Sequence, residues 1–118
     1  MSEAVRRHLD LGCGSKPRNP YNCAELYGVD IREDLSASGV VRIMAANLSL
    51  QPIPFADNYF DSLSAYDFLE HVPRAALDYA AGITHFPFVE LMNEVWRVLR
   101  PGGVFYAVTP AYPHEKAF

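Results

Sequence analysis

The stretch Leu9-Asp10-Leu11-Gly12-Cys13-Gly14 decides how the rest of this 118-residue sequence is interpreted. Apolar residues from Val5 onward predict a strand that ends at Leu11, and the glycines that follow predict a tight turn. A glycine-rich turn directly after a strand lets a ligand approach the backbone closely, because no side chain stands in the way. In open α/β sheets such a turn lies at the carboxyl edge of the strands, where ligands bind.

Four further short segments predict strands of the same sheet. They are rich in Val, Ile and aromatic residues and are separated by turn residues, which is typical of buried parallel strands. The segments are 26–30, 40–44, 60–66 and 104–109. Because strands alternate with helical segments along the chain, the sequence predicts an open α/β sheet.

One long amphipathic helix precedes the last predicted strand. Its apolar residues form a single stripe at helical spacing, and Pro87 suits the first turn. The stripe consists of Phe88, Leu91, Met92, Val95, Trp96 and Leu99, and the turn 101–103 ends the helix. We expect this stripe to pack against the sheet.

Shorter helices are predicted after the fourth strand. Asp67 and Glu70 have the spacing of a capping box, and a further helical piece is expected over 73–81 with Gly82 as its stop. The segment 75–85 is an insertion that is interpreted either as a lid or as a passive loop or extra helix. The connections 15–24 and 31–39 are too short for full crossover helices, so we expect loops or single turns there.

Asp30 is the second residue with chemical meaning. It lies twenty residues after Asp10 and ends the second predicted strand. A carboxylate at this place can accept hydrogen bonds from both hydroxyls of a ribose. The alternative is a turn aspartate at the start of the polar run 32–34.

Taken in order, these segments resemble the class I S-adenosylmethionine-dependent methyltransferases. Residues 9–14 resemble the first motif of that family and Gly28-Val29-Asp30 resembles the second. The matching continues in the loop into the fourth strand, in the segment after it, and in the helix and turn before the fifth, at 54–61, 69–72 and 94–103. The resemblance implies a Rossmann-like open parallel sheet in the order 3-2-1-4-5, with S-adenosyl-L-methionine bound at its carboxyl edge.

The resemblance also implies which residues bind the cofactor. The turn 10–14 would hold the methionine end, Asp30 the ribose, and Ile31 would lie against the adenine. Asn47 and Leu48 stand where the family places an acid and an apolar residue around the adenine, and the Asn47 amide oxygen could accept from the adenine amino group. The implied set is Asp10, Leu11, Gly12, Cys13, Gly14, Asp30, Ile31, Asn47, Leu48 and Tyr66.

Catalytic residues are less clearly indicated than cofactor residues. His71 lies beyond the fourth strand, near the expected methyl-transfer region, and an imidazole there could serve as a general base. The alternative for His71 is a polar residue in the first turn of a helix. Methyl transfer can rest on proximity and orientation, so the sequence does not require a dedicated base.

Three departures from the family pattern matter. Lys16 replaces the third glycine of the first motif, and the first two crossover helices are shortened. The sequence ends at Phe118, before the antiparallel sixth and seventh strands that the family adds. We therefore expect residues 1–118 to form a single S-adenosylmethionine-binding core domain that is C-terminally incomplete. The strand 104–109 would then be an edge without protecting lysine, proline or inward charge, and a partner chain could cover it.

The composition of the sequence limits the classes of binding partner that we expect. Half of the residues are apolar, and the net charge is −4, so the basic excess typical of nucleic-acid binding is absent. We expect a small-molecule substrate rather than nucleic acid. No apolar run approaches the ~20 residues of a membrane span. Two cysteines without metal-ligand spacing indicate reduced thiols, no metal site and a cytoplasmic protein.

Two other functional classes compete with a methyltransferase. A nicotinamide-dependent dehydrogenase would need glycine at position 17, where this chain has Pro17. A non-catalytic S-adenosylmethionine-binding module, acting as a regulator or partner subunit, shares the cofactor motifs and stays open.

Overall fold

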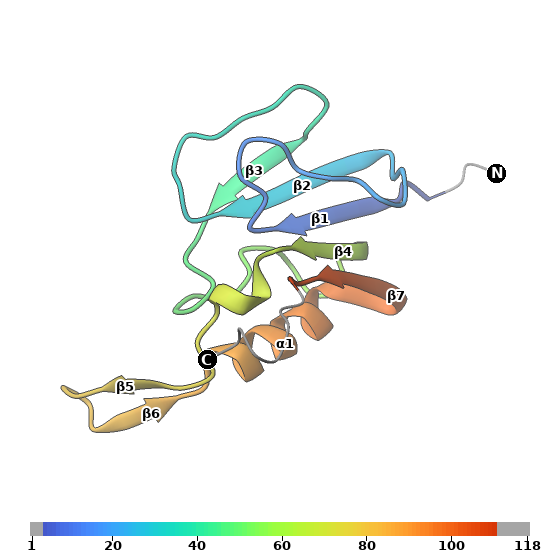
Figure 1. Ribbon diagram of the computed structural model, residues 1–118. Coiled ribbons are helices and arrows are strands. Elements are labelled where there is room, and N and C mark those ends of the chain that lie inside the picture. The colour runs from blue at the N-terminus through green and yellow to red at the C-terminus, as the bar shows by residue number, and fades with distance from the viewer. Residues whose placement is uncertain (1–3, 111–118) are drawn as a thin grey trace.

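Five parallel strands form the sheet of this protein, for which a computed structural model describes residues 4–110 (Figure 1). Their spatial order is β3-β2-β1-β4-β7, which confirms the order predicted for the first five strands, since β7 takes the fifth place. The strands are β1 (Arg7–Leu11), β2 (Glu25–Asp30), β3 (Arg42–Ala45), β4 (Phe60–Tyr66) and β7 (Leu99–Val108).

The register brings the carboxyl ends of the strands to one edge. Leu11 of β1 pairs with Val29 of β2 and with Ala65 of β4. At the two sides of the sheet, Asp30 pairs with Ala45 and Tyr66 pairs with Val108. The turns that follow β1, β2, β3 and β4 therefore lie side by side.

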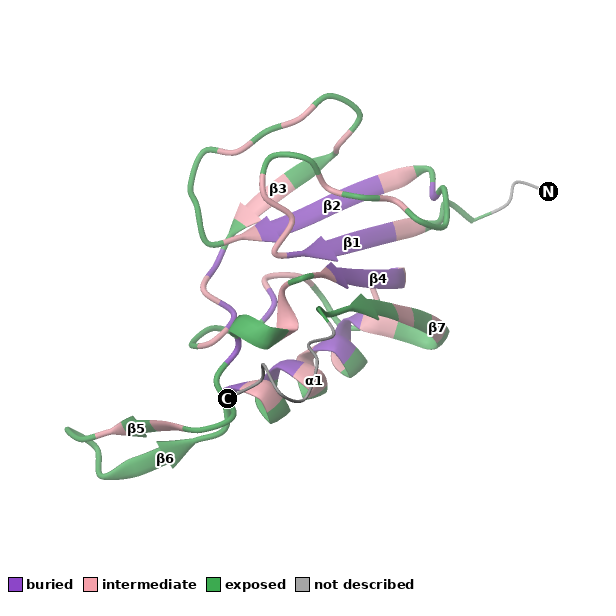
Figure 2. Ribbon diagram, in the orientation of Figure 1, coloured by how far each residue is buried: buried purple, intermediate pink, exposed green. Residues whose placement is uncertain are grey.

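Helix α1 (Pro87–Val98) covers one face of the sheet (Figures 1 and 2). Its buried residues Leu91, Val95 and Val98 belong to the same core cluster as the apolar residues of β1, β2 and β4. Trp96 was predicted to join this apolar stripe, but it is 82% exposed. It lies about 100° around the helix from Val95, on the side away from Leu91, and so points away from the core.

Arg97 connects α1 to the loop that leads into β4. Its guanidinium donates to the carbonyls of Ile53 and Phe55 at 2.8 and 2.9 Å and forms ion pairs with Glu94 and Asp57. These two carboxylates raise the Arg97 pKa, so the charge is permanent. In this loop Ile53 belongs to the core and Phe55 packs against it, and Arg97 thereby fixes how β4 enters the sheet.

The other face of the sheet carries a buried ladder of polar side chains. His8 Nδ1 and Nε2 each lie 2.7 Å from a serine hydroxyl, those of Ser62 and Ser64. Ser64 donates in turn to Asp10 Oδ1 at 2.7 Å. Because the Ser64 proton goes to Asp10, His8 Nε2 must donate to Ser64, and Nδ1 must accept from Ser62.

This ladder predicts how His8 titrates. Burial lowers the His8 pKa to about 4, so the ring stays neutral in the folded chain at pH 6. Since the unfolded ring takes up a proton near pH 6.5, stability falls between pH 6.5 and 4, by up to about 3 kcal/mol. Burial raises the pKa of Asp10, and this shift changes the stability in the opposite direction, since it favours the folded chain as the pH falls. Nuclear magnetic resonance of the His8 ring is expected to show the neutral Nε2–H form at pH 5.5, and a midpoint near 6.5 would contradict this.

Loops replace helices in the first two crossovers, as the short connections predict. In the described residues no α-helix lies between β1 and β2 or between β2 and β3. The first loop covers the polar face instead: Arg18 N donates to Asp10 Oδ2 at 2.9 Å, and Cys23 Sγ lies 3.6 Å from Ser62 Oγ.

Of the two helices predicted after β4, the first is reduced to a short 3₁₀ turn without the predicted capping box, and the second, over 73–81, is wrong. A short 3₁₀ turn (Leu69–His71) follows Phe68 without a side-chain cap, and Asp67 adopts a positive φ of 51° instead of a capping conformation. In place of a helix over 73–81, strands β5 (Ala76–Asp78) and β6 (Ile83–His85) form an antiparallel hairpin that projects from the body and is largely exposed (Figure 2).

Local hydrogen bonds explain the hairpin. Asp78 accepts from Ala81 N with its side chain and from Gly82 N with its carbonyl, which closes a turn in place of a helix. Gly82, expected as a helix stop, takes φ +67° within this turn. No helix in the described part of the chain has the length and apolarity that crossing a membrane needs.

Candidate functional site

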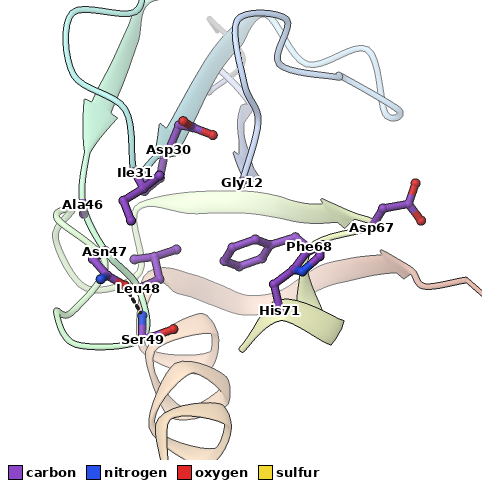
Figure 3. A pocket seen from close by; sticks show the side chains of 11 residues that line it. Gly12, Asp30, Ile31, Ala46, Asn47, Leu48, Ser49, Asp67, Phe68 and His71 are labelled. Carbon is purple, nitrogen blue, oxygen red and sulfur yellow. Dashed lines mark hydrogen bonds between the residues drawn. The ribbon is translucent and has the colours of Figure 1, made fainter. Parts of the chain in front are cut away.

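A cavity of about 300 Å³ opens at the carboxyl edge of the sheet (Figure 3). It lies where β1, β2 and β3 end and where the chain leaves β4, so four segments distant in sequence meet there. Its lining residues are Gly12, Val29, Asp30, Ile31, Ala46, Asn47, Leu48, Ser49, Asp67, Phe68 and His71.

Half of the predicted cofactor residues line this cavity, and the candidate base lines it too. Gly12, Asp30, Ile31, Asn47 and Leu48 do so, together with His71.

The other five lie beside the cavity rather than in its wall. Leu11 is fully buried in the core, and Asp10 is buried on the polar face of the sheet. Cys13 and Gly14 continue the turn, and Tyr66 ends β4.

The glycine turn sits against Phe68. Gly12 adopts φ +63°, and a Cβ added there would meet three carbon atoms of the Phe68 side chain within 3.0 Å. Cys13 N donates to Val29 O at 3.1 Å, which ties the turn to the end of β2. Burial, together with the nearby Asp10 and Asp30 carboxylates, raises the Cys13 pKa to about 12, which keeps this thiol protonated near neutral pH.

Phe68 is a site residue that the sequence analysis missed. Its ring lies among the lining side chains, between Leu48 and the glycine turn (Figure 3). The positive φ of Asp67 redirects the chain at the end of β4 and brings Phe68 there. The only available signal was an apolar residue directly after a strand end, which is too common to single out.

Asp30 is held as an ionised carboxylate at the cavity wall. Its Oδ1 accepts from Gly14 N at 3.0 Å, and its Oδ2 accepts from Arg32 N and Nε at 3.0 and 3.1 Å. Burial alone would raise the Asp30 pKa, but the hydrogen bonds from Arg32 and Gly14 outweigh it, and the pKa is lowered.

Arg32 occupies hydrogen-bond acceptor positions on Asp30 that a ribose would need. A carboxylate has about four acceptor positions, and three of those on Asp30 are taken. Two ribose hydroxyls therefore require the exposed Arg32 side chain to release Oδ2.

Arg32→Ala is expected to strengthen binding of an adenosine ligand by about two- to fivefold, because an exposed ion pair of up to about 1 kcal/mol no longer competes. Titration calorimetry of the wild-type and variant chains measures the change. Weaker binding by the variant would show that Arg32 supports the ligand instead.

The opposite end of the cavity suits a flat apolar ring with a polar edge. Leu48 is buried and Ile31 is 66% exposed, and Figure 3 shows both side chains facing into the cavity. Asn47 lies at the rim, where its Oδ1 accepts from Ser49 N at 3.1 Å and its N donates to Gln51. The Asn47 side chain is thus held in place with one acceptor position left.

His71 is exposed at the end of the 3₁₀ turn, and its N donates to Phe68 O at 2.9 Å. The ring lies beside Phe68 at the cavity mouth (Figure 3). Its role as a base stays a prediction.

Taken together, the donor and acceptor set fits a nucleoside. The Asp30 carboxylate can accept hydrogen bonds from hydroxyls, and Ile31 and Leu48 offer apolar contact. Among residues 4–110 no group of three or more His, Cys, Asp or Glu side chains is placed to hold a metal ion.

Comparison with known proteins gives an independent view of this arrangement. The family described as a methyltransferase domain matches residues 9–107. A solved structure described as a complex between the Haloferax volcanii Trm112 methyltransferase activator and a candidate methyltransferase has a similar fold, with a TM-score of 0.63 and 17% sequence identity. The match covers 92% of this chain but 46% of that chain, so this chain spans less than half of its neighbour's length. No curated protein sequence matches.

Proposed function

Because the chain belongs to the methyltransferase domain family, we propose that it transfers the methyl group of S-adenosyl-L-methionine to an acceptor. The observation that carries this proposal is the cavity at the carboxyl edge. Gly12 and Asp30 line it together with the apolar side chains of Ile31 and Leu48. These are the features that a nucleoside cofactor requires. We propose that residues 1–118 fold as a single S-adenosylmethionine-binding core domain.

Each part of the cavity has a role in this proposal. Asp30 would accept from the ribose hydroxyls, Ile31 and Leu48 would contact the adenine, and the Asn47 amide would bind its edge. The turn 10–14 and Tyr66 would surround the amino-acid end. The cofactor supplies an electrophilic methyl group, and the chain's own residues orient the reactants and exclude water, so catalysis rests on proximity. His71 at the cavity mouth would accept a proton where the acceptor carries one.

A small-molecule acceptor in the cytoplasm fits the chain best. The net charge of −4 disfavours phosphate-rich partners. Cys13 and Cys23 are free thiols, as expected in a reducing compartment.

A partner chain along β7 is the second part of the proposal. Among the described strands β7 stands at the end of the sheet, and Val104, Tyr106 and Val108 on it are exposed. The structural neighbour was solved as a complex with an activator.

The test is a transfer assay with S-adenosylmethionine labelled in the methyl group, incubated with the chain and a small-molecule extract. Label is expected in a low-mass product that chromatography separates from S-adenosylmethionine, and the Asp30→Asn variant is expected to reduce it strongly. Cofactor binding without transfer to any fraction would favour the alternative, a non-catalytic binding module or partner subunit. Label in protein or nucleic acid would correct the acceptor class.

A further inference from the structure

Arg18 lies at the same edge of the sheet but outside the cavity wall. Its guanidinium carbon stands 4.4 Å from the centroid of the Tyr66 ring, a cation–π contact. The Tyr66 ring in turn packs against Tyr106, with centroids 5.7 Å apart. The first crossover loop therefore places a positive charge over the end of β4.

The Arg18 backbone fixes this position. Its N–H donates to Asp10 Oδ2 at 2.9 Å, and Asp10 is itself buried and bonded to Ser64. The anchoring carboxylate directly precedes the glycine turn in the chain. Arg18 is thus tied to the place at which the amino-acid end of the cofactor would emerge from the nucleoside cavity.

The Arg18 guanidinium forms no ion pair in the described part of the chain, although its charge acts at longer range on the Asp10 carboxylate. Ion pairs within 4.0 Å engage the guanidinium groups of Arg7, Arg32, Arg97 and Arg100 with carboxylates, but none engages that of Arg18. The Arg18 guanidinium also donates no hydrogen bond to a described residue, since its recorded contact is the Tyr66 ring. Its planar set of N–H donors is free to bind an anion.

We propose that Arg18, held over Tyr66, binds the carboxylate of the cofactor's amino-acid end. The proposal rests on the proposed function and adds a residue outside the motifs that carry the family resemblance. A guanidinium presents two parallel N–H donors that match a carboxylate, and stacking on a ring fixes the plane of this fork before the ligand arrives. Arg18 thereby selects for a ligand with a carboxylate at this end.

Lys16 provides a matched control. It lies in the same loop, carries the same charge and is exposed, but it has no aromatic contact among residues 4–110. Lys16→Gln removes the same long-range attraction as Arg18→Gln and leaves the Tyr66 cluster intact.

The test uses titration calorimetry with two probes that differ only in the carboxylate. S-Adenosylhomocysteine carries it, whereas S-adenosyl-3-thiopropylamine keeps the nucleoside, the sulfur and the amine without it. Arg18→Gln is expected to weaken S-adenosylhomocysteine about tenfold or more and to change S-adenosyl-3-thiopropylamine by less than about twofold. Lys16→Gln is expected to change neither by more than about twofold.

Equal weakening of both probes by Arg18→Gln, or of neither, would overturn the assignment to the carboxylate while leaving the proposed function intact. A wild-type chain that binds neither probe would overturn the proposed function, and this assignment with it. Arg18→Lys, which keeps the charge but loses the planar fork, is expected to fall between the wild type and Arg18→Gln.

Discussion

Gly12→Ala is expected to abolish measurable binding of S-adenosylhomocysteine and to lower the free energy of unfolding by roughly 2–5 kcal/mol. Two costs combine. The backbone at φ +63° is strained for a residue with a Cβ, and that Cβ would overlap three carbons of Phe68. Because Phe68 lines the cavity, moving its ring away from the turn disturbs the cofactor site as well as the packing. Urea unfolding and calorimetry measure the two effects.

Gly82→Ala separates these costs. Gly82 adopts a similar φ of +67°, but nothing lies within 4 Å of an added Cβ. Its replacement is expected to cost only the conformational strain of roughly 1–2 kcal/mol and to leave binding unchanged. If the two alanine variants lose the same stability and Gly12→Ala still binds the ligand, the contact between Gly12 and Phe68 has no importance for the site.

Asp30→Asn is expected to weaken binding of S-adenosylhomocysteine at least about tenfold, since a charge-assisted hydrogen bond is worth roughly 1.5–3 kcal/mol. The amide nitrogen cannot accept from a ribose hydroxyl, and the remaining oxygen must serve both the ligand and the protein donors Gly14 and Arg32. Thermal unfolding of the variant shows whether the fold survives. An unchanged dissociation constant would return Asp30 to the role of a turn residue.

Asp34→Asn is the matched control, because Asp34 is exposed in the loop that follows Asp30 and its φ of +60° suits asparagine. It is expected to leave binding unchanged. Since the Asp30 pKa is lowered, its carboxylate stays charged down to pH values below the ordinary 3.8. Its contribution to stability is therefore present above that value and is lost as the pH falls through the lowered pKa.

The sheet could be predicted because its signals are local and repeat along the chain. Each buried strand is a short apolar segment that a turn residue ends, and the stripe of α1 is long enough to show its period. The segment between β4 and α1 was mispredicted because its outcome depends on single residues. Asp67 at positive φ prevents a capping box, and Asp78 closes a hairpin turn where alanines favour a helix.

The site divides in the same way. The cavity residues Gly12, Asp30 and Leu48 lie at or after strand ends and were predicted, whereas the place of Phe68 depends on how the chain turns after β4. The polar face of the sheet is visible in the sequence as polar residues at every second position, His8 and Asp10 in β1 and Ser62 and Ser64 in β4. Only the parallel register shows that these side chains meet, because sequence spacing alone does not pair β1 with β4.

Titration calorimetry of the chain with S-adenosylhomocysteine and with NAD⁺ tests most directly whether the cavity binds an adenosyl-amino-acid cofactor. Both ligands contain adenosine, so a difference in affinity measures how the site binds the rest of the ligand. After the glycine turn, Pro17 stands where a dinucleotide-binding motif has glycine. Saturable binding of S-adenosylhomocysteine with no heat from NAD⁺ is the expected result. Tight binding of NAD⁺ with no signal from S-adenosylhomocysteine would contradict the assignment of this site.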